Sequence, residues 1–255
     1  MSKPRFVTGL RAVEQLLANR SDEVKKLLAE YRTANPRVEA VIARAKELGV
    51  EIQEANRARL KQISGESRHQ GLVAEIKRSP TVDEAGLRTL VEERLTEYPV
   101  PPLLLLVLDA IQDPHNLGAC LRSADAVGVD AAIVPRHGAA GLGPTVSKVA
   151  AGAAETLPIV AVANLSRVLS WLSEYSVTII GTCDEAPESL FDCDLTGPVA
   201  IVMGGEHKGL RNGVVARCDK IVSLPMRGEV ASLNVSVATG VCLYEVLRQR
   251  RKNRN

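Results

Sequence analysis

The sequence predicts an α/β protein in two parts, the larger of which is a parallel β-sheet covered by helices on both faces. From Leu103 onward, continuous apolar segments of strand length alternate with segments of helical periodicity, a pattern typical of strands buried on both sides. The first 78 residues alternate in the same way over shorter elements. With 255 residues, 45% of them hydrophobic, and a mean hydropathy of +0.02, the chain can bury one large core or two smaller ones.

Residues 1–78 are expected to form a compact α/β domain. Apolar residues recur at helical spacing in 9–19 and in 37–49, and Gly49 is the expected stop of the second helix. The other elements expected here are strands at 24–31, 50–55 and 71–77 and a short helix at 57–63.

Residues 79–102 are expected to be an interdomain linker. Prolines break regular structure at both ends of this segment, and the charged stretch between them has little to bury. A larger domain, 103–255, then alternates strands with helices. Its strands are expected at 103–109, 130–135, 158–163, 177–183, 198–204 and 220–226, and its helices from Asn116, near Val146, at 165–175 and from about Leu233 through Arg248.

Composition excludes several classes of protein. Only 3% of the residues are aromatic, which argues against recognition by an aromatic stacking platform. The five cysteines form no C-x-x-C pair and have no short spacing to any of the four histidines, so thiols in a reducing cytosol are favoured over disulfides or zinc. The longest apolar run, 99–108, is about half as long as a membrane span. A cytoplasmic protein with no metal and no membrane span is expected.

The net charge of +2 is unevenly distributed. Residues 1–78 hold 16 Lys and Arg against 10 Asp and Glu, a net charge of +6, whereas the remainder holds 16 against 20, a net charge of −4. A further basic cluster lies in the tail, 248–254. Basic segments attract a polyanion such as RNA through its phosphates. Any single Lys or Arg is explained equally well as part of a solvated helix face.

Three segments place polar residues where a packed core would not require them. They are DPHNLGACLRSADA (113–126), IVMGGEHKGLR (201–211) and ASLNVSVATG (231–240), and each sets Asn, Arg, Glu or Ser among glycines and small apolar residues. None of them spells G-x-G-x-x-G or a Walker A loop, which argues against an ordinary dinucleotide or nucleoside triphosphate site. Together they predict one active site assembled from three loops.

In order and spelling, these segments resemble the SpoU (TrmH) family of RNA ribose methyltransferases, part of the SPOUT superfamily. The family's first motif, N-x-G-A-x-x-R-S-A, is met by 116–124. Its second motif, Gly and Glu after an apolar strand, is met by 204–209, and its third, S-L-N-V-S-V-A, is matched letter for letter by 232–238. A weaker resemblance covers the N-terminus, where Gly9 and an Ala-Val pair fit the opening of RlmB-type members, although Arg11 stands where histidine is common.

The resemblance implies a fold, a cofactor and an assembly. The fold is a SPOUT-type parallel sheet with a C-terminal trefoil knot, preceded by a small α/β domain that holds the RNA substrate. Loops of the knot hold S-adenosyl-L-methionine, and homodimers form their sites at the subunit interface, usually through the last helix. The residues expected to bind the cofactor are Thr182, Gly204, Gly205, Leu224, Leu233 and Ser236.

Three of the five candidate catalytic residues also have a structural explanation. Asn116 could cap the helix that it begins, and Ser232 could cap the last helix, which would leave Asn234 unexplained. Glu206 could satisfy the turn before Leu210. Arg122, like Asn234, is not explained by capping. The expected catalytic set is Asn116, Arg122, Glu206, Ser232 and Asn234.

Arg122 is expected to lie among small residues in a partly buried setting, where an arginine must be paired or must meet an anion. A carboxylate beside it, such as Glu206, would orient its guanidinium bidentately. The resemblance implies that this arginine acts on the ribose 2′-hydroxyl. Because the reference pKa of arginine lies above ~12, positioning the hydroxyl and stabilising negative charge is favoured over proton abstraction.

The function expected from the resemblance is methyl transfer from S-adenosyl-L-methionine to the ribose 2′-hydroxyl of a guanosine in 23S rRNA. Two alternatives remain open. One is a tRNA 2′-O-ribose methyltransferase of the same fold, and the other is a non-catalytic RNA-binding ribosome-assembly factor. The residues do not name the nucleotide that is modified.

Overall fold

The computed structural model of the chain describes residues 5–19, 21, 24–30, 35–65, 69–76, 82–96, 101–206 and 208–252. The chain divides into two compact units, Met1–Pro80 and Thr81–Asn255. Among the described residues, no helix is both long enough and apolar enough to cross a membrane.

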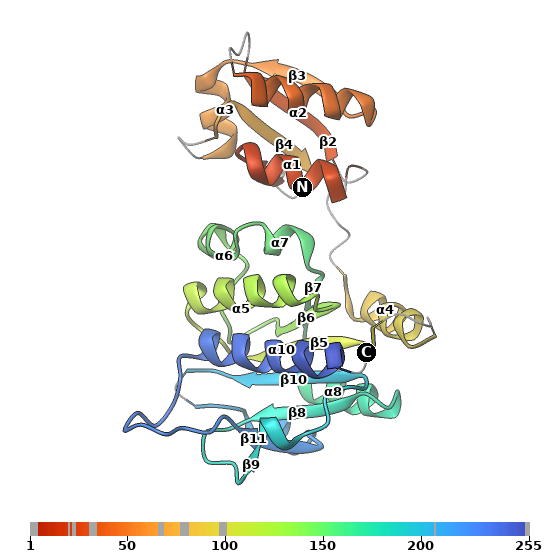
Figure 1. Cartoon of the computed structure of the whole chain (residues 1–255), viewed down its shortest axis with the longest axis vertical. Helices are drawn as coiled ribbons and strands as arrows, with labels where there is room; N and C mark the ends of the chain where they lie inside the picture. The colour runs from red at the N-terminus through yellow and green to blue at the C-terminus, as the bar shows by residue number, and fades with distance from the viewer. Residues whose placement is uncertain are drawn as a thin grey trace. The chain divides into compact units, whose positions relative to one another are not determined.

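The N-terminal unit is a four-stranded sheet with helices on both faces (Figure 1). The strand order is β1-β4-β2-β3, in which β4 runs antiparallel to both of its neighbours and β2 runs parallel to β3. Buried side chains of α1 and α2 pack on one face, and the buried Leu60 of α3 packs on the other. The elements are β1 (Arg5–Thr8), α1 (Leu10–Asn19), β2 (Val24–Glu30), α2 (Pro36–Glu47), β3 (Glu51–Ala55), α3 (Arg57–Ser64) and β4 (Leu72–Ile76).

Most elements of this unit lie where the sequence placed them. Gly49 follows the last turn of α2 with a φ of 73°, a left-handed conformation that glycine adopts without steric cost. Strand β1 was missed because four residues are too few to show a period. Tyr31 and Lys77, at the ends of two expected strands, lie outside the described residues.

The larger unit is a seven-stranded sheet in the order β7-β6-β5-β10-β8-β11-β9, and all of its strand pairs among the described residues are parallel. This confirms the predicted α/β class and the parallel sheet. The strands are β5 (Leu104–Asp109), β6 (Ala131–Pro135), β7 (Ile159–Val162), β8 (Thr178–Thr182), β9 (Glu188–Ser189), β10 (Val199–Gly204) and β11 (Lys220–Ser223).

Helices cover both faces of this sheet, which explains the continuous apolar strands (Figure 1). Leu106 of β5 faces a core shared with α5, α6, α7 and α10, whereas its neighbour Leu105 faces a core shared with α4, α8 and α9. The helices are α4 (Glu84–Thr96), α5 (Pro114–Val127), α6 (Pro144–Ala150), α7 (Ala153–Thr156), α8 (Leu165–Glu174), α9 (Asn212–Val215), α10 (Val235–Lys252) and a 3₁₀ turn (Leu190–Asp192).

Helix α4 corrects the expected linker. It occupies thirteen residues of the 79–102 segment, and its Leu87 and Val91 are fully buried in the core of the larger unit. In the sequence this helix shows only one apolar stripe among many charged residues. The prolines on both sides of it therefore favoured the prediction of a linker. Ser79, Pro80 and Pro99 lie outside the described residues.

The strand order determines where the loops meet. From β5 the chain proceeds through α5 to β6 on one side, and β10 returns to pair with β5 on the other side. At such a reversal the loops at the carboxyl ends of the strands diverge and leave a crevice. The loops after β5, β8, β10 and β11 therefore open at one edge of the sheet, where the three motif segments also lie.

Candidate active site

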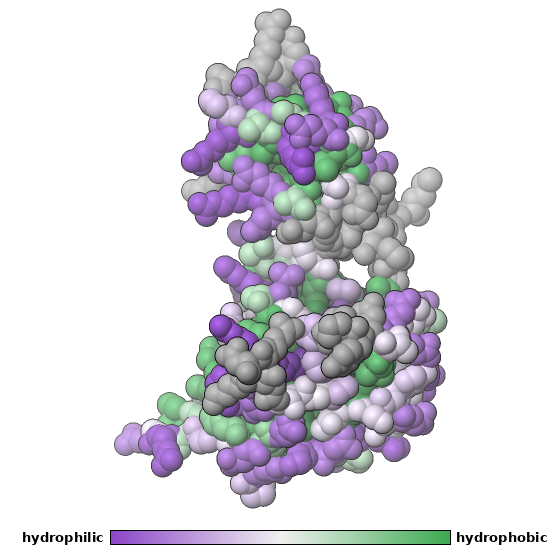
Figure 2. Space-filling model, turned by 45° about the vertical axis from the view of Figure 1, so that its right-hand side comes forward, coloured by the Kyte–Doolittle hydropathy of each residue, from purple (hydrophilic) through white to green (hydrophobic). Residues whose placement is uncertain are grey.

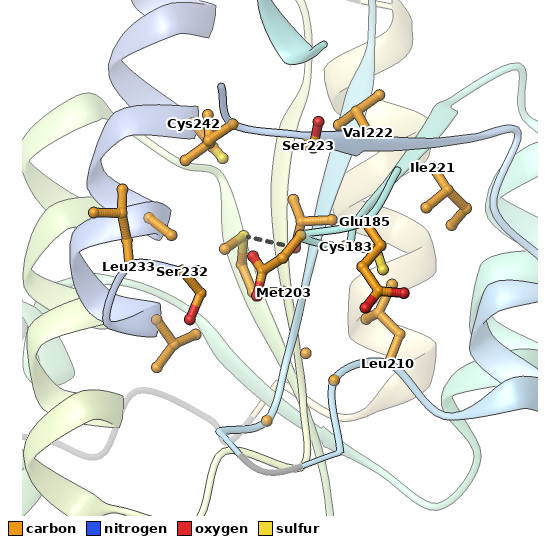
Figure 3. A pocket seen from close by; sticks show the side chains of 18 of the residues that line it. Cys183, Glu185, Met203, Leu210, Ile221, Val222, Ser223, Ser232, Leu233 and Cys242 are labelled. Carbon is orange, nitrogen blue, oxygen red and sulfur yellow. Dashed lines mark hydrogen bonds between the residues drawn. The ribbon is translucent and has the colours of Figure 1, made fainter. Parts of the chain in front are cut away.

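A pocket of about 620 Å³ opens at the carboxyl ends of β8, β10 and β11 and is closed by the segment that leads into α10. In Figure 3, Ser232 and Leu233 lie on one side of it and Cys183, Glu185 and Leu210 on the other, with Met203 between them. A cavity of this size with mixed apolar and polar walls is typical of a site for a small molecule or cofactor.

The two glycines that end β10 are required by the packing of the loop itself. A Cβ at Gly204 would lie 2.3 Å from the carbonyl carbon of Gly209, and one at Gly205 would lie 2.6 Å from the backbone oxygen of Ala110. Gly205 and Gly209 also form an isolated antiparallel bridge. Any side chain at either glycine would push the loop away from its neighbours and reshape the pocket wall.

Glu206 is held by hydrogen-bond donors from the loop after β5. The Nδ2 of Asn116 donates to its Oε1 at 2.9 Å. The backbone N–H groups of Gln112 and Asp113 donate to its two carboxylate oxygens at 3.2 and 3.3 Å. Adjacent loops at the sheet edge are thereby joined through one side chain.

These neutral donors keep Glu206 ionised. Partial burial raises the pKa of its carboxyl, but the hydrogen bonds from Asn116 and from the backbone N–H groups outweigh that effect, so the pKa lies below its usual value. A carboxylate whose oxygens are held in this way is suited to fixing geometry and presenting negative charge.

A chain of amides extends this arrangement to the last helix. Asn234 donates from its Nδ2 to the Oδ1 of Asn116 at 3.0 Å, and its own Oδ1 accepts from the backbone N–H of Ser236 at 2.9 Å. The three motif segments thus meet through Asn116, Glu206 and Asn234. We expected from the sequence that the polar residues of these three segments would lie together, and in the structure they do.

The helix-capping roles considered for Asn116 and Ser232 are carried out by other residues. The N-cap of α5 is Asp113, whose Oδ1 accepts from the backbone N–H of His115 at 2.8 Å, so Asn116 is not the cap. At α10 the residue immediately before the helix is Asn234, and it makes the cap-like hydrogen bond that was considered for Ser232. Asn234 therefore both begins a helix and joins the network.

Arg122 lies apart from these residues. It is exposed on α5 and makes no hydrogen bond or ion pair with the described residues. The expectations of a partly buried setting and of a pairing with Glu206 within one chain were wrong, because Glu206 is already bound by donors from 112–116. Among the residues that the structure describes, the Arg122 guanidinium therefore has no polar partner.

The structure brings most of the other sequence-predicted residues together. Asn116 joins them through Glu206, and Ser236 joins them through Asn234. The predicted residues that line the pocket are Thr182, Gly204, Gly205, Glu206, Leu224, Ser232, Leu233 and Asn234. The hydroxyl of Thr182 donates to the backbone oxygen of Val202 at 3.1 Å.

An ion pair beneath the pocket wall was missed. Asp109, fully buried at the end of β5, accepts from the backbone N–H and the Nε of Arg211 at 2.9 and 2.7 Å, and from its Nη2 at 2.6 Å. The pair anchors the loop that carries Glu206. An acidic residue that ends a buried strand was the available signal, but its partner lies 102 positions away.

The pocket lining suits a positively charged organic cofactor. Three acidic side chains, Asp184, Glu185 and Glu206, line it together with one cationic side chain, Lys208. Among the residues that the structure describes, no group of three or more His, Cys, Asp and Glu could hold a metal ion.

Comparisons with known proteins agree with this geometry. The model of the SpoU rRNA Methylase family matches residues 103–244, and the model for RNA 2′-O ribose methyltransferase substrate binding matches residues 6–82. The chain is 49% identical to the 23S rRNA (guanosine-2′-O-)-methyltransferase RlmB of Pseudomonas syringae pv. tomato, with 100% of this chain and 99% of the relative covered. It is 46% identical to the RlmB of Coxiella burnetii, with 98% of each covered.

A solved structure extends the likeness to three dimensions. The SpoU methyltransferase AviRb of Streptomyces viridochromogenes, crystallised in complex with the cofactor AdoMet, matches with a TM-score of 0.75 at 26% identity, over 98% of this chain and 92% of that one. Fold, motifs and sequence identity agree, and the chain belongs to the SpoU rRNA methylase family.

Proposed function

We propose that this chain transfers the methyl group of S-adenosyl-L-methionine to the ribose 2′-hydroxyl of a guanosine in 23S rRNA. The observation that carries the proposal is the network of Asn116, Glu206 and Asn234 at the mouth of the pocket, in a chain that matches RlmB proteins over its full length. The residues of 1–78 are proposed to hold the RNA.

The cofactor fits the pocket by charge and size. Its sulfonium and ammonium groups are cations, and the carboxylates of Asp184, Glu185 and Glu206 line the cavity. The residues proposed to hold it are Thr182, Gly204, Gly205, Leu224, Leu233 and Ser236. When bound, the cofactor supplies an electrophilic methyl group.

The protein's own residues supply position and charge. Glu206 and Asn116 fix the loop edge next to which the ribose must lie, and Ser232 offers a hydroxyl at the pocket wall. Arg122, with no polar partner among the described residues, is available to bind the ribose oxygen and stabilise the negative charge that develops there. Holding the hydroxyl in line with the methyl group supplies much of the rate.

We infer a homodimer in which α10 forms the contact. Val237 and Tyr244 are 52% and 54% exposed, and their spacing of seven residues puts them on one face of α10. A neighbouring subunit would cover this face and could bring a carboxylate or an RNA phosphate to the exposed Arg122. A C-terminal trefoil knot and a cytoplasmic location complete the proposal. Analytical ultracentrifugation tests the dimer. The wild type should sediment with the mass of two chains and Val237→Glu with the mass of one, and equal masses for the two proteins would contradict the proposed contact.

The decisive experiment uses rRNA from a strain that lacks this gene. Purified protein, labelled S-adenosyl-L-methionine and this rRNA should give one ribose-methylated guanosine in 23S rRNA, located by resistance to alkaline cleavage. NAD should not bind. Methylation of tRNA instead would favour the tRNA alternative, and cofactor binding without any methyl transfer would favour the assembly factor.

A further inference from the structure

Another hollow lies within the N-terminal unit. Helix α3 has eight residues and covers only part of its face of the sheet, through a small cluster around Leu28, Leu60 and Val73. Beside it is a hollow of about 730 Å³. Figure 2 shows hydrophobic surface between hydrophilic side chains on this unit. The hollow is lined by Phe6, Lys26, Leu28, Gln53, Glu54, Ala55, Asn56, Arg59, Gln62, Ile63 and Glu75.

One row of side chains crosses the floor of this hollow. Glu75 of β4 is paired directly with Phe6 of β1 on one side and with Lys26 of β2 on the other. Residues directly opposite each other on adjacent strands project to the same face of a sheet. An aromatic ring, a carboxylate and an ammonium group therefore lie side by side.

The carboxylate in this row is buried. The side chain of Glu75 is only 10% exposed, and it contacts the Nζ atoms of Lys25 and Lys26 at 2.8 and 3.2 Å. Replacing a buried ion pair with apolar residues of similar volume is often neutral or stabilising. A role in folding alone is therefore weak grounds for a carboxylate in the centre of a small sheet.

The two lysines leave part of the carboxylate free. An ionised carboxylate offers about four lone-pair positions, and the lysines occupy one on each oxygen. The remaining positions can accept two parallel N–H donors. At the rim, Gln53 and Gln62 add amide groups and Arg59 adds a guanidinium, while Phe6 and Leu28 offer apolar contact.

We propose that this hollow binds one unpaired guanine of the RNA substrate. The Watson–Crick edge of guanine carries two adjacent donors, N1–H and N2–H₂, next to the acceptor O6, whereas adenine and cytosine each offer one donor group next to an acceptor. Glu75 accepts from the two donors, Lys26 donates to O6, and the ring of Phe6 contacts the face of the base. Unpaired bases read on this edge are a common basis of sequence-specific RNA recognition.

The proposal rests on the proposed function, because it assigns a base to the unit that is proposed to hold RNA. It concerns a place apart from the methyl-transfer pocket, so its failure can be recognised separately. Rim cations such as Arg59 would hold the phosphates that flank the base.

The test uses the full chain and three labelled oligonucleotides, ten-nucleotide oligoadenylates with a central guanosine, inosine or adenosine. Inosine lacks only the N2 amino group of guanosine. Fluorescence anisotropy should show the guanosine oligomer bound about tenfold more tightly than the other two. Glu75→Gln should bind all three equally, because an amide presents only one acceptor atom.

The matched control is Glu39→Gln, which removes an exposed carboxylate from α2 on the other side of the sheet and should keep the preference for guanosine. Phe6→Leu keeps the apolar volume but loses the ring, and it should weaken binding of the guanosine oligomer. Thermal unfolding of each variant checks that the unit is folded.

Equal affinity of the wild type for guanosine and inosine, or a preference that survives in Glu75→Gln, would overturn the guanine site. Methylation of 23S rRNA by the same preparation would then show that the proposed function stands. Loss of the guanosine preference together with no methyl transfer to any RNA would overturn both.

Discussion

The two units each hold a carboxylate with a lowered pKa, but they hold it in opposite ways. Three neutral donors bind Glu206, and partial burial opposes them. At Glu75, the hydrogen bond from Lys25 lowers the pKa most, burial raises it, and Lys26 lowers it further. The first cluster therefore keeps one negative charge, and the second, with two lysines, carries one net positive charge.

The difference shows what each cluster is prepared to receive. A carboxylate that is fixed by dipoles still attracts a cation, such as a sulfonium cofactor or a guanidinium from another subunit. A carboxylate that is flanked by ammonium groups suits a ligand that carries hydrogen-bond donors and an acceptor side by side. A base in an RNA chain is such a ligand, and its phosphates add negative charge for the lysines. The comparison can be tested by removing one charge at a time.

The largest effect is expected from Arg122→Ala. Loss of the free cation should reduce methyl transfer by roughly 10²–10³-fold or more, because charge develops on the ribose oxygen only in the transition state. The melting temperature should not change, since Arg122 is exposed and has no polar partner among the described residues. Single-turnover methylation and thermal unfolding are the measurements. Arg122→Lys is the control, because lysine keeps the positive charge but lacks the planar guanidinium that can donate two parallel hydrogen bonds. Normal turnover in the alanine variant would remove Arg122 from the mechanism.

Glu206→Gln should reduce methylation by about a hundredfold, because the negative charge and one of the two equivalent acceptors are lost. The variant should also lose part of the pH dependence of stability. Since the folded pKa of Glu206 lies below its unfolded value, its stabilisation is complete above about pH 4.3 and is lost as the pH falls through the folded pKa. Acid titration of unfolding free energy for both proteins checks this. Identical acid profiles would contradict the hydrogen-bond account.

Arg211→Met should lower the free energy of unfolding by about 2–3 kcal/mol, because it leaves the fully buried carboxylate of Asp109 without its cation. Cofactor affinity should fall with it, since the same pair anchors the loop after β10. Chemical denaturation and calorimetric titration are the measurements. A suitable control is Arg217→Met, at an exposed position in the turn just after α9. Equal stability of the two variants would show that the ion pair does not hold the loop.

The smallest effect is expected from the lysines of the N-terminal unit. The hydrogen bond from Lys25 lowers the pKa of Glu75 most, but Lys25 is 59% exposed and Lys26 only 27% exposed, so solvent screening reduces the contribution of Lys25 to stability more. Lys25→Gln should leave the melting temperature almost unchanged, and Lys26→Gln should lower it slightly more. Differential scanning calorimetry of both variants would show the order, and the reverse order would contradict it.

The sequence predicted which residues lie together at the sheet edge better than it predicted the contacts between them. Polar residues after apolar strands identified Asn116, Glu206 and Asn234, because the carboxyl ends of parallel strands meet at one edge. The sequence did not reveal that Glu206 would accept hydrogen bonds from the loop after β5, or that Arg122 would have no polar partner among the described residues. Which loops become neighbours depends on strand order, and the sequence does not state that β10 lies beside β5.

The missed features have the same origin. The partner of Asp109 lies 102 positions away, and Glu75 becomes notable only when Phe6 and Lys26 are placed beside it. Helix α4 was missed for a local reason, because Leu87 and Val91 are too few to stand out among charged residues. Local periodicity predicts elements, and pairing between distant segments determines the chemistry.

The hydrogen bonds of the active site also bear on the order in which the chain folds. Those that join Glu206 to the loop after β5 span 90 to 94 positions, and the one from Asn234 to Asn116 spans 118. Contacts of such sequence separation form slowly, because the intervening chain must first be ordered. The network of Asn116, Glu206 and Asn234 can close only after β5 and β10 have paired and the last helix has docked. Protection of the Gln112 and Asp113 amides against hydrogen exchange would therefore report when folding is complete. An incomplete chain still emerging from a ribosome would lack the last helix and could not form this network.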